Sequence, residues 1–227
     1  MSGHDVAGRE APRRNRVVHT SLWHGRMERR WGERGCWRNL QVSIKASVFI
    51  ATSLDGFIAR ANGDLDWLTG AESAQTEQDY GYQEFMDTVD TIVVGRNTFE
   101  LTSTFDTWPY SGKKVVVLSS RPSAIPPHLV DNVEWLSLPP QQLAERLAAQ
   151  GAAHLYVDGG KTIQGFLTAG LINELIVTRI PVLIGTGIPL FGSLDHDLRL
   201  THVETRQFEN GFVQSRYRIE GEEASST

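Results

Sequence analysis

Four short segments of the chain combine glycine, hydroxyl and charged residues in a way that suits a phosphorylated ligand. Each follows an apolar, strand-like stretch, and together they cover residues 52–56, 95–98, 119–121 and 158–162. Glycine lets backbone N–H groups approach an anion, and the N-terminus of a following helix adds about half a positive charge. Arginine makes bidentate contacts with phosphate. We therefore predict that these segments bind one polyphosphate ligand together.

Each segment also has a simpler interpretation. Gly95, Gly159 and Gly160 are of a type common in turns, and the serines before Arg121 fit a plain loop. Asn97, with a glutamate three residues later, matches a capping box and predicts a helix start. The joint occurrence at successive strand ends favours the ligand site over any one of these readings.

The usual nucleotide-binding fingerprints are absent from the sequence. No G-x-G-x-x-G occurs; Gly185-Thr186-Gly187 comes closest, but Leu190 stands where the third glycine belongs. No P-loop is present either. A phosphate-binding function therefore depends on the four segments above.

Two carboxylates near the first segment are candidate proton donors. Asp55 and Asp66 stand close to Phe57 and Trp67, and a carboxyl beside aromatic walls can have a raised pKa. The alternatives are that Asp55-Gly56 forms a turn and that Asp66 is a surface or capping acid. We predict both as catalytic residues and keep these alternatives open.

The elements that position these residues alternate along the chain. Apolar runs predict strands and amphipathic stretches predict helices. The strands are expected at 44–51, 91–94, 114–118, 154–157 and 174–180, with one or two within 207–219; the helices are expected at 72–88, from Asn97, at 141–150 and at 161–169. This alternation predicts an α/β fold with a mostly parallel sheet, helices on both faces and an antiparallel edge. Ligands of such sheets bind at the carboxyl ends of the strands.

Composition and charge narrow the class of protein. The 227 residues carry a formal net charge of −5, which argues against a nucleic-acid binder. Residues 1–43 hold nine arginines and four acids, net +5, which leaves −10 for 44–227. The single cysteine, Cys36, excludes an intramolecular disulfide and a multi-cysteine metal site. We expect a cytoplasmic protein without metal or membrane partner, with a disordered extension at 1–43, one domain at 44–220 and a frayed tail at 221–227.

Six motifs resemble one family over about residues 44–218. They are S-L-D-G-F-I-A at 53–59, D-L-D-W-L at 64–68, V-G-R-N-T-F-E at 94–100, L-S-S-R at 118–121, V-D-G-G at 157–160 and L-I-G-T-G-I-P-L-F at 183–191. The chain resembles the dihydrofolate reductase superfamily. Within it, the reductase domain of the bacterial bifunctional riboflavin-biosynthesis deaminase–reductase and its stand-alone relatives are most similar.

The resemblance implies a three-layer dihydrofolate-reductase-like fold and an NADPH site. By position in the motifs, the implied phosphate contacts are Gly95, Arg96, Asn97 and Thr98, with Gly159, Gly160, Lys161 and Thr162 at the pyrophosphate. The implied contacts of the adenosine 2′-phosphate are Ser119, Ser120 and Arg121, and those bordering the nicotinamide are Ala51, Ser53 and Gly56. A preference for NADPH over NADH follows from Arg121 and the two hydroxyls.

The resemblance also implies hydride transfer to a pyrimidine or pterin-like heterocycle. The deaminase half is absent, and one cysteine cannot build its zinc site. A dihydrofolate reductase proper and a catalytically inactive nucleotide-binding module remain as alternatives. Relatives of this kind often pair as homodimers, so the resemblance also implies a homodimer here, and residues 181–191 are a candidate interface or a core cover.

The substrate itself stays open at this point. A phosphorylated substrate would require a basic cluster, for which Arg60, Lys113, Lys114 and Arg179 are the candidates in an acidic domain. Trp108 and Tyr110 are suited to hold a planar heterocycle, or they pack a loop.

Overall fold

An eight-stranded sheet forms the centre of the computed structural model, which describes residues 44–68 and 78–220. The strand order is β5-β4-β3-β6-β1-β7-β10-β9, and β2 pairs with β8 separately. The strands are β1 (Lys45–Ser53), β2 (Phe57–Ala59), β3 (Thr91–Gly95), β4 (Lys114–Leu118), β5 (Val133–Leu136), β6 (His154–Asp158), β7 (Glu174–Ile180), β8 (Ile188–Pro189), β9 (Leu200–Gln207) and β10 (Val213–Ile219). The extension at 1–43 and the tail at 221–227 lie outside the described residues, so both remain predictions.

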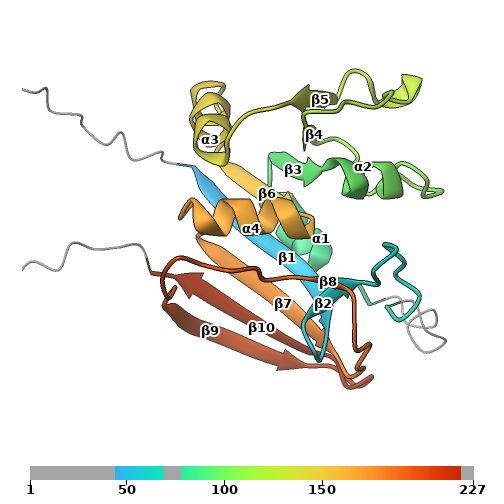
Figure 1. The fold of residues 1–227 in the computed structure, drawn as a ribbon, viewed down its shortest axis with the longest axis vertical. Helices are drawn as coiled ribbons and strands as arrows, with labels where there is room; N and C mark the ends of the chain where they lie inside the picture. The colour runs from blue at the N-terminus through green and yellow to red at the C-terminus, as the bar shows by residue number, and fades with distance from the viewer. Residues whose placement is uncertain (1–43, 69–77, 221–227) are drawn as a thin grey trace, which may run out of the picture. The chain divides into compact units, whose positions relative to one another are not determined.

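The sheet is mostly parallel with an antiparallel edge, as the sequence predicts. β1 runs parallel to β6 and β7, and β3 runs parallel to β4 and β6. β10 runs antiparallel to β7 and to β9. Central strands such as β4 are rich in fully buried valine, which is typical of strands covered on both faces. The carboxyl ends of β1, β3, β4, β6 and β7 therefore share one edge of the sheet (Figure 1).

Helices cover both faces of this sheet (Figure 1). α3 (Pro140–Ala149) and α4 (Gly160–Thr168) pack in one core with Val48 and Leu155. α1 (Tyr82–Thr88) and α2 (Arg96–Thr102) pack in a second core with Ile92 and Tyr156. Because neighbouring residues of a strand point to opposite faces, Leu155 and Tyr156 belong to different layers. Within the described ranges, no helix has the length and apolar character needed to cross a membrane.

Several predicted elements differ from those observed. The helix expected at 72–88 is observed only as α1, while 69–77 lie outside the described residues. β5, β9, the 3-10 turn at Pro127–Leu129 and the small β2–β8 pair were not predicted, since the late strands were expected only within 207–219. The capping box is wrong: α2 begins directly after β3, so Gly95 is the N-cap and Asn97 is already inside the helix. No side chain caps α2.

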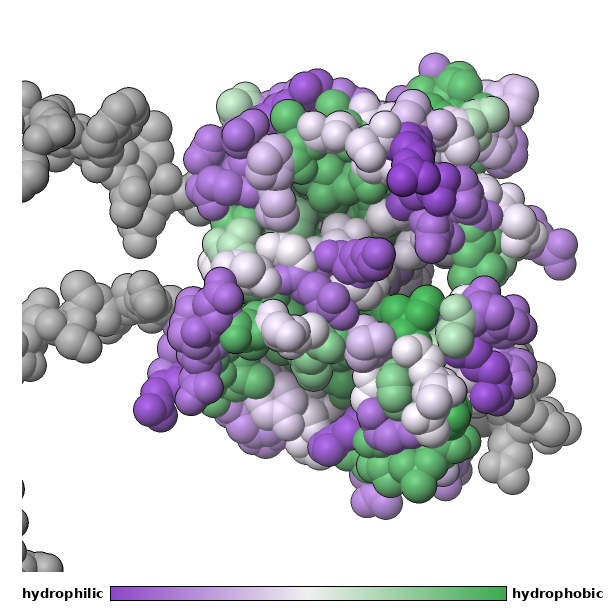
Figure 2. All heavy atoms as spheres, in the orientation of Figure 1, coloured by the Kyte–Doolittle hydropathy of each residue, from purple (hydrophilic) through white to green (hydrophobic). Residues whose placement is uncertain are grey.

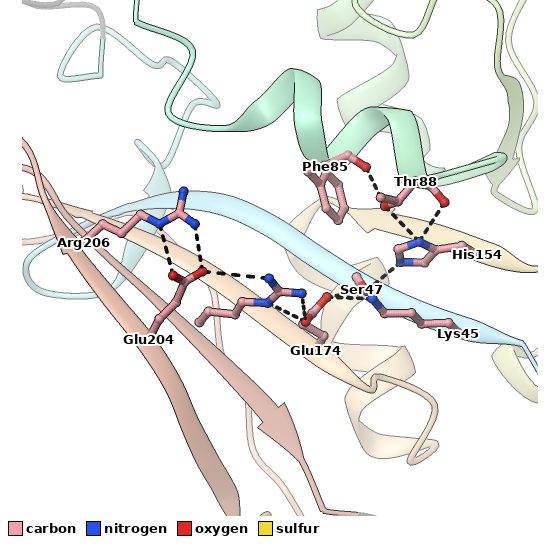
Figure 3. A network of polar contacts seen from close by, with 9 residues as sticks. Lys45, Ser47, Phe85, Thr88, His154, Glu174, Glu204 and Arg206 are labelled. Carbon is pink, nitrogen blue, oxygen red and sulfur yellow. Dashed lines mark hydrogen bonds and ion pairs between the residues drawn. The ribbon is translucent and has the colours of Figure 1, made fainter.

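A polar network lies at the amino ends of the strands, away from the four predicted segments (Figure 3). The buried Ser47 hydroxyl lies 2.8 Å from His154 Nε2 and 3.3 Å from a carboxylate oxygen of Glu174. Glu174 forms ion pairs with Lys45 at 2.9 Å and Arg216 at 2.6 Å. Burial acts to raise the pKa of Glu174, but the hydrogen bonds from these two cations offset it, and the pKa is lowered. The network therefore joins β1, β6, β7 and β10 through compensated charges.

His154 is expected to make folding sensitive to mild acid. Burial lowers the pKa of His154, so the folded chain resists a proton that the unfolded chain takes up near pH 6.5. His154 should not reduce the free energy of unfolding above that pH, and the free energy of unfolding should decrease as the pH falls below it. Urea unfolding at pH 7.5, 6.0 and 5.0 should show a smaller loss of stability in His154→Gln than in the wild type. An unchanged pH dependence in the variant would exclude His154 as the source.

Candidate functional site

The loops after β3 and β6 contact each other through reciprocal glycine–threonine pairs. A Cβ added to Gly159 would lie 2.5 Å from the Thr98 hydroxyl oxygen and 3.7 Å from the Gly95 backbone nitrogen. A Cβ added to Gly95 would lie 3.0 Å from the Thr162 hydroxyl oxygen. Gly159 also has a φ of +93°, a backbone conformation that residues other than glycine rarely adopt. These two predicted segments therefore form one surface.

The first turn of α4 faces this surface. No side chain caps α4, and its first residue, Gly160, is packed against Ile58, Ile188 and the Pro189 carbonyl. Backbone N–H groups in the first turn of a helix have no partners within the helix, so they suit an anion. Lys161 beside them is exposed. The arrangement matches what a diphosphate requires.

The third segment lies next to the first two because β4 pairs with β3. Leu118 at the end of β4 is in register with Gly95. The Ser119 hydroxyl accepts a hydrogen bond from the Arg121 backbone N–H at 3.0 Å and donates to the Arg121 carbonyl at 3.1 Å. This turn leaves Ser120 and Arg121 exposed. At the start of α2, Arg96 is partly exposed and Asn97 is exposed.

Asp55 joins the loop after β1 to the loop after β7. Its carboxylate accepts hydrogen bonds from the Ser53 hydroxyl at 2.6 Å, the Gly185 N–H at 2.8 Å and the Ile184 N–H at 3.3 Å. The bond from Ser53, with those from the two backbone groups, lowers the pKa of Asp55. The expectation of a raised pKa at Asp55 is therefore wrong, while its catalytic role stays a prediction.

Asp66 is on the surface and paired. Its side chain is 60% exposed, and the Arg60 guanidinium donates to both carboxylate oxygens, at 2.5 Å and 2.9 Å. This hydrogen bonding lowers the pKa of Asp66. The neighbouring Trp67 is buried with Ile180 and Phe212 in a core cluster, and the expected rise in the Asp66 pKa is wrong as well. The catalytic role of Asp66 likewise stays a prediction.

Asp158 is a carboxyl with a raised pKa at this edge of the sheet. It ends β6, and burial raises its pKa despite hydrogen bonds from the Gly159 N–H at 2.7 Å and the Tyr110 hydroxyl at 3.2 Å. Asp158 lies within the predicted segment 158–162, but no role of its carboxyl is predicted from the sequence. The signal that would have singled it out is an acid at the end of an otherwise apolar strand, directly before two glycines.

Aromatic side chains gather on the same side of the sheet as Asp158. We call them the aromatic cluster: Phe49, Tyr82, Phe85, Trp108, Tyr110 and Tyr156. Tyr82 and Trp108 are partly exposed, and Tyr110 is buried. Burial raises the pKa of Tyr82 and of Tyr110, and the nearby Asp158 charge adds to both shifts, so both phenols stay protonated. Flat rings beside a carboxyl group suit a planar heterocycle with hydrogen-bonding edges.

The loops beside Asp55 carry exposed apolar side chains. Leu54 is 57% exposed and Leu183 is 69% exposed, and the Leu54 N–H donates to the Val182 carbonyl at 2.8 Å. Figure 2 shows apolar atoms at this lower end of the molecule, over the loops that follow β1 and β7. Further along, Leu190 is fully buried and Gly187 is packed against the Ala59 carbonyl. Part of the 181–191 segment thus covers the core, and its role in a dimer stays a prediction.

Comparisons with known proteins place this site in a family context. The family model of the RibD C-terminal domain matches residues 45–214. The uncharacterized protein YwjB of Bacillus subtilis is 35% identical over 169 residues, 72% of this chain and 92% of its own length. The riboflavin biosynthesis protein RibD of Corynebacterium ammoniagenes is 30% identical over 66% of this chain, which corresponds to 46% of that protein. The crystal structure of a putative riboflavin biosynthesis protein from Shewanella sp. PV-4 is 39% identical with a TM-score of 0.73, over 78% of this chain and 99% of that one.

Proposed function

The chain belongs to the RibD C-terminal domain family, and from that membership we propose that it is a reductase that uses NADPH to reduce a pyrimidine or pterin-like heterocycle. The family match supports a riboflavin-biosynthesis type of reductase. The observation that carries the proposal is the interlocking of the loops after β3 and β6, beside the uncapped start of α4. Such a surface suits the diphosphate of a dinucleotide.

The residues present fit NADPH. The diphosphate would be held by the first-turn N–H groups of α4, with Lys161 and Arg96 as nearby cations and Thr98 and Thr162 as hydroxyl donors. The exposed Ser120 and Arg121 would meet the 2′-phosphate. When bound, NADPH supplies the hydride, and the protein supplies alignment and charge.

The chain's own groups would serve the heterocycle. The partly exposed rings of Tyr82 and Trp108 in the aromatic cluster would hold its plane, and Tyr82 would offer a hydroxyl that remains protonated. Asp158, whose pKa burial raises, would deliver the proton from its carboxyl oxygen to the reduced substrate. The Tyr110 hydroxyl and the Gly159 N–H would fix the orientation of that carboxyl.

Cofactor selectivity tests the proposal directly. Titration with NADPH and with NADH, followed by tryptophan fluorescence, should show NADPH binding at least about tenfold tighter, because a bidentate arginine contact to phosphate contributes on the order of 1.4 kcal/mol or more. Arg121→Ala should remove most of that preference, and Arg179→Ala should leave it unchanged. Equal affinity for both cofactors would contradict the 2′-phosphate assignment. NADPH binding without oxidation in the presence of any tested heterocycle would favour the inactive module instead.

A further inference from the structure

A strained turn leads into α1. Tyr80 has a φ of +56°, and within residues 44–68 and 78–220 it is the only residue other than glycine with a positive φ. Gly81 follows it with a φ of +82°. A left-handed conformation is unfavourable for a residue with a side chain, and it persists only where the surrounding contacts hold it. The contacts of Tyr80 therefore show what maintains this turn.

Two side-chain amides of the β9–β10 hairpin hold Tyr80. Gln214 is buried in β10, in register with Thr178 of β7. Its amide donates hydrogen bonds to the Tyr80 carbonyl at 3.1 Å and to the Thr178 hydroxyl at 3.0 Å. The Asn210 amide donates to the Tyr80 hydroxyl at 2.8 Å. The hairpin thus holds Tyr80 at its backbone and at the end of its side chain.

Further contacts fix the Tyr80 ring and the backbone around it. The ring stacks on that of Phe212, with the two centroids 5.4 Å apart. Within the turn, the Asp79 carboxylate accepts hydrogen bonds from the Gly81 N–H at 3.0 Å and the Gln83 N–H at 2.9 Å. Because so many contacts agree on one conformation, the turn has a fixed direction when it enters α1.

This direction sends two nearby tyrosines into different clusters. Tyr80 packs with Ile180 in a small core cluster. Tyr82, the first residue of α1, instead packs in the aromatic cluster, with ring centroids 5.5 Å from Phe49 and 6.4 Å from Tyr156. In an extended chain, residues two apart would point to the same side. The left-handed turn is therefore what separates the two rings.

We propose that Gln214 and Asn210 are positioning residues for the heterocycle: through Tyr80 they hold the start of α1 where Tyr82 belongs to the aromatic cluster. The inference rests on the proposed function, in which Tyr82 contacts the substrate. In the sheet, β7 and β1 separate β10 from β6, which precedes the glycine loop of the cofactor site. Disturbing the hairpin contacts should therefore affect the substrate and leave NADPH binding unchanged.

The first experiment follows Tyr82 without any ligand. The rings of the five tyrosines of the full chain are labelled with ¹³C, and the Tyr→Phe variants at 80 and 82 assign two of the NMR signals. Gln214→Met keeps the side-chain length and removes both donated hydrogen bonds, so the Tyr80 and Tyr82 signals should both shift. Ser215→Ala is the matched control: it removes the 3.1 Å hydrogen bond of a buried neighbour to Thr205 and should leave both signals in place. A Tyr82 signal that does not move in Gln214→Met overturns the inference.

The second experiment tests whether a substrate-like ligand responds to the same change. The chain is saturated with NADP⁺, so that no reduction occurs, and titrated by calorimetry with lumazine, an uncharged fused pyrimidinedione. Gln214→Met and Tyr82→Phe should each weaken lumazine binding about fivefold, the effect of about one hydrogen bond. The double variant should bind no more weakly than Tyr82→Phe alone, because both changes act through one side chain. Additive losses, or an equal loss of NADP⁺ affinity in Gln214→Met, would contradict the positioning role.

Failure of the proposed function has a different signature. A wild-type chain that binds neither NADP⁺ nor lumazine contradicts the proposed function, while the tyrosine signals still decide whether Gln214 positions Tyr82. If Gln214→Met does not fold, Asn210→Ala is measured in its place with the same expectations, because it removes the donor to the Tyr80 hydroxyl.

Discussion

Gly159→Ala is expected to weaken NADPH binding by on the order of thirtyfold, equivalent to about 2 kcal/mol. The added Cβ would lie 2.5 Å from the Thr98 hydroxyl oxygen, so the Thr98 side chain must rotate away or the loops after β3 and β6 must separate. The φ of +93° adds strain of about 1–3 kcal/mol for any residue with a side chain. Since the diphosphate would bind where these loops meet, their separation removes several contacts at once. Fluorescence titration with NADPH measures the effect.

Gly170→Ala provides the matched control for that experiment. Gly159 precedes α4 and Gly170 follows it. Gly170 has a φ of +66° and open space around an added Cβ. The free energy of unfolding of the Gly170→Ala variant should therefore decrease by about 1 kcal/mol, while its affinity for NADPH should not change. If both variants lost affinity in proportion to their loss of stability, the loop contact would have no specific role.

The parts of the fold that the sequence predicts well are those with a strong local pattern. The strands at 114–118 and 174–180 are predicted to the residue, because β4 contains three consecutive valines and β7 a Leu-Ile-Val run, each flanked by polar or turn residues. β5 carries Glu134 and Trp135 and is at the edge of the sheet, where half-exposed strands lose the apolar signal. β2 is three residues long and β8 is two, and they pair with each other, which no local sequence pattern encodes.

The same distinction between local patterns and long-range contacts explains which features of the candidate site could be predicted. The glycine and hydroxyl residues after β3 and β6 are recognisable locally, and the structure brings Gly95, Thr98, Gly159 and Thr162 together. The pKa shifts of the carboxyls depend on burial, which raises the pKa of Asp158, and on hydrogen-bond partners, of which some are near in the sequence and others far along the chain. Asp55 accepts hydrogen bonds from backbone N–H groups 129 and 130 residues away, and Asp158 accepts one from the Tyr110 hydroxyl, 48 residues away. The sequence therefore indicates the acids but not the sign of their pKa shifts.

Asp158→Asn is expected to reduce turnover by about 10²–10⁴-fold while NADPH affinity is retained. Asparagine keeps the size of the side chain and an oxygen for the Gly159 N–H, but it has no proton to deliver at neutral pH. Asp55→Asn is the comparison, because Asp55 has a lowered pKa and is held as an anion by Ser53, Gly185 and Ile184. A loss of turnover in Asp55→Asn as large as in Asp158→Asn would restore Asp55 as the proton donor.

The pH profile distinguishes proton delivery by Asp158 from a purely structural role. Only the protonated carboxyl can donate, so kcat should fall as the pH rises through the raised pKa of Asp158. The hydrogen bond from Tyr110 stabilises the carboxylate, so Tyr110→Phe should raise the pKa of Asp158 further and move the alkaline limb of the kcat profile to higher pH. A structural role would lower kcat equally at all pH values and leave the limb in place. The alkaline limb of the kcat profile should therefore move to higher pH in Tyr110→Phe, whereas a loss of stability alone would not move it.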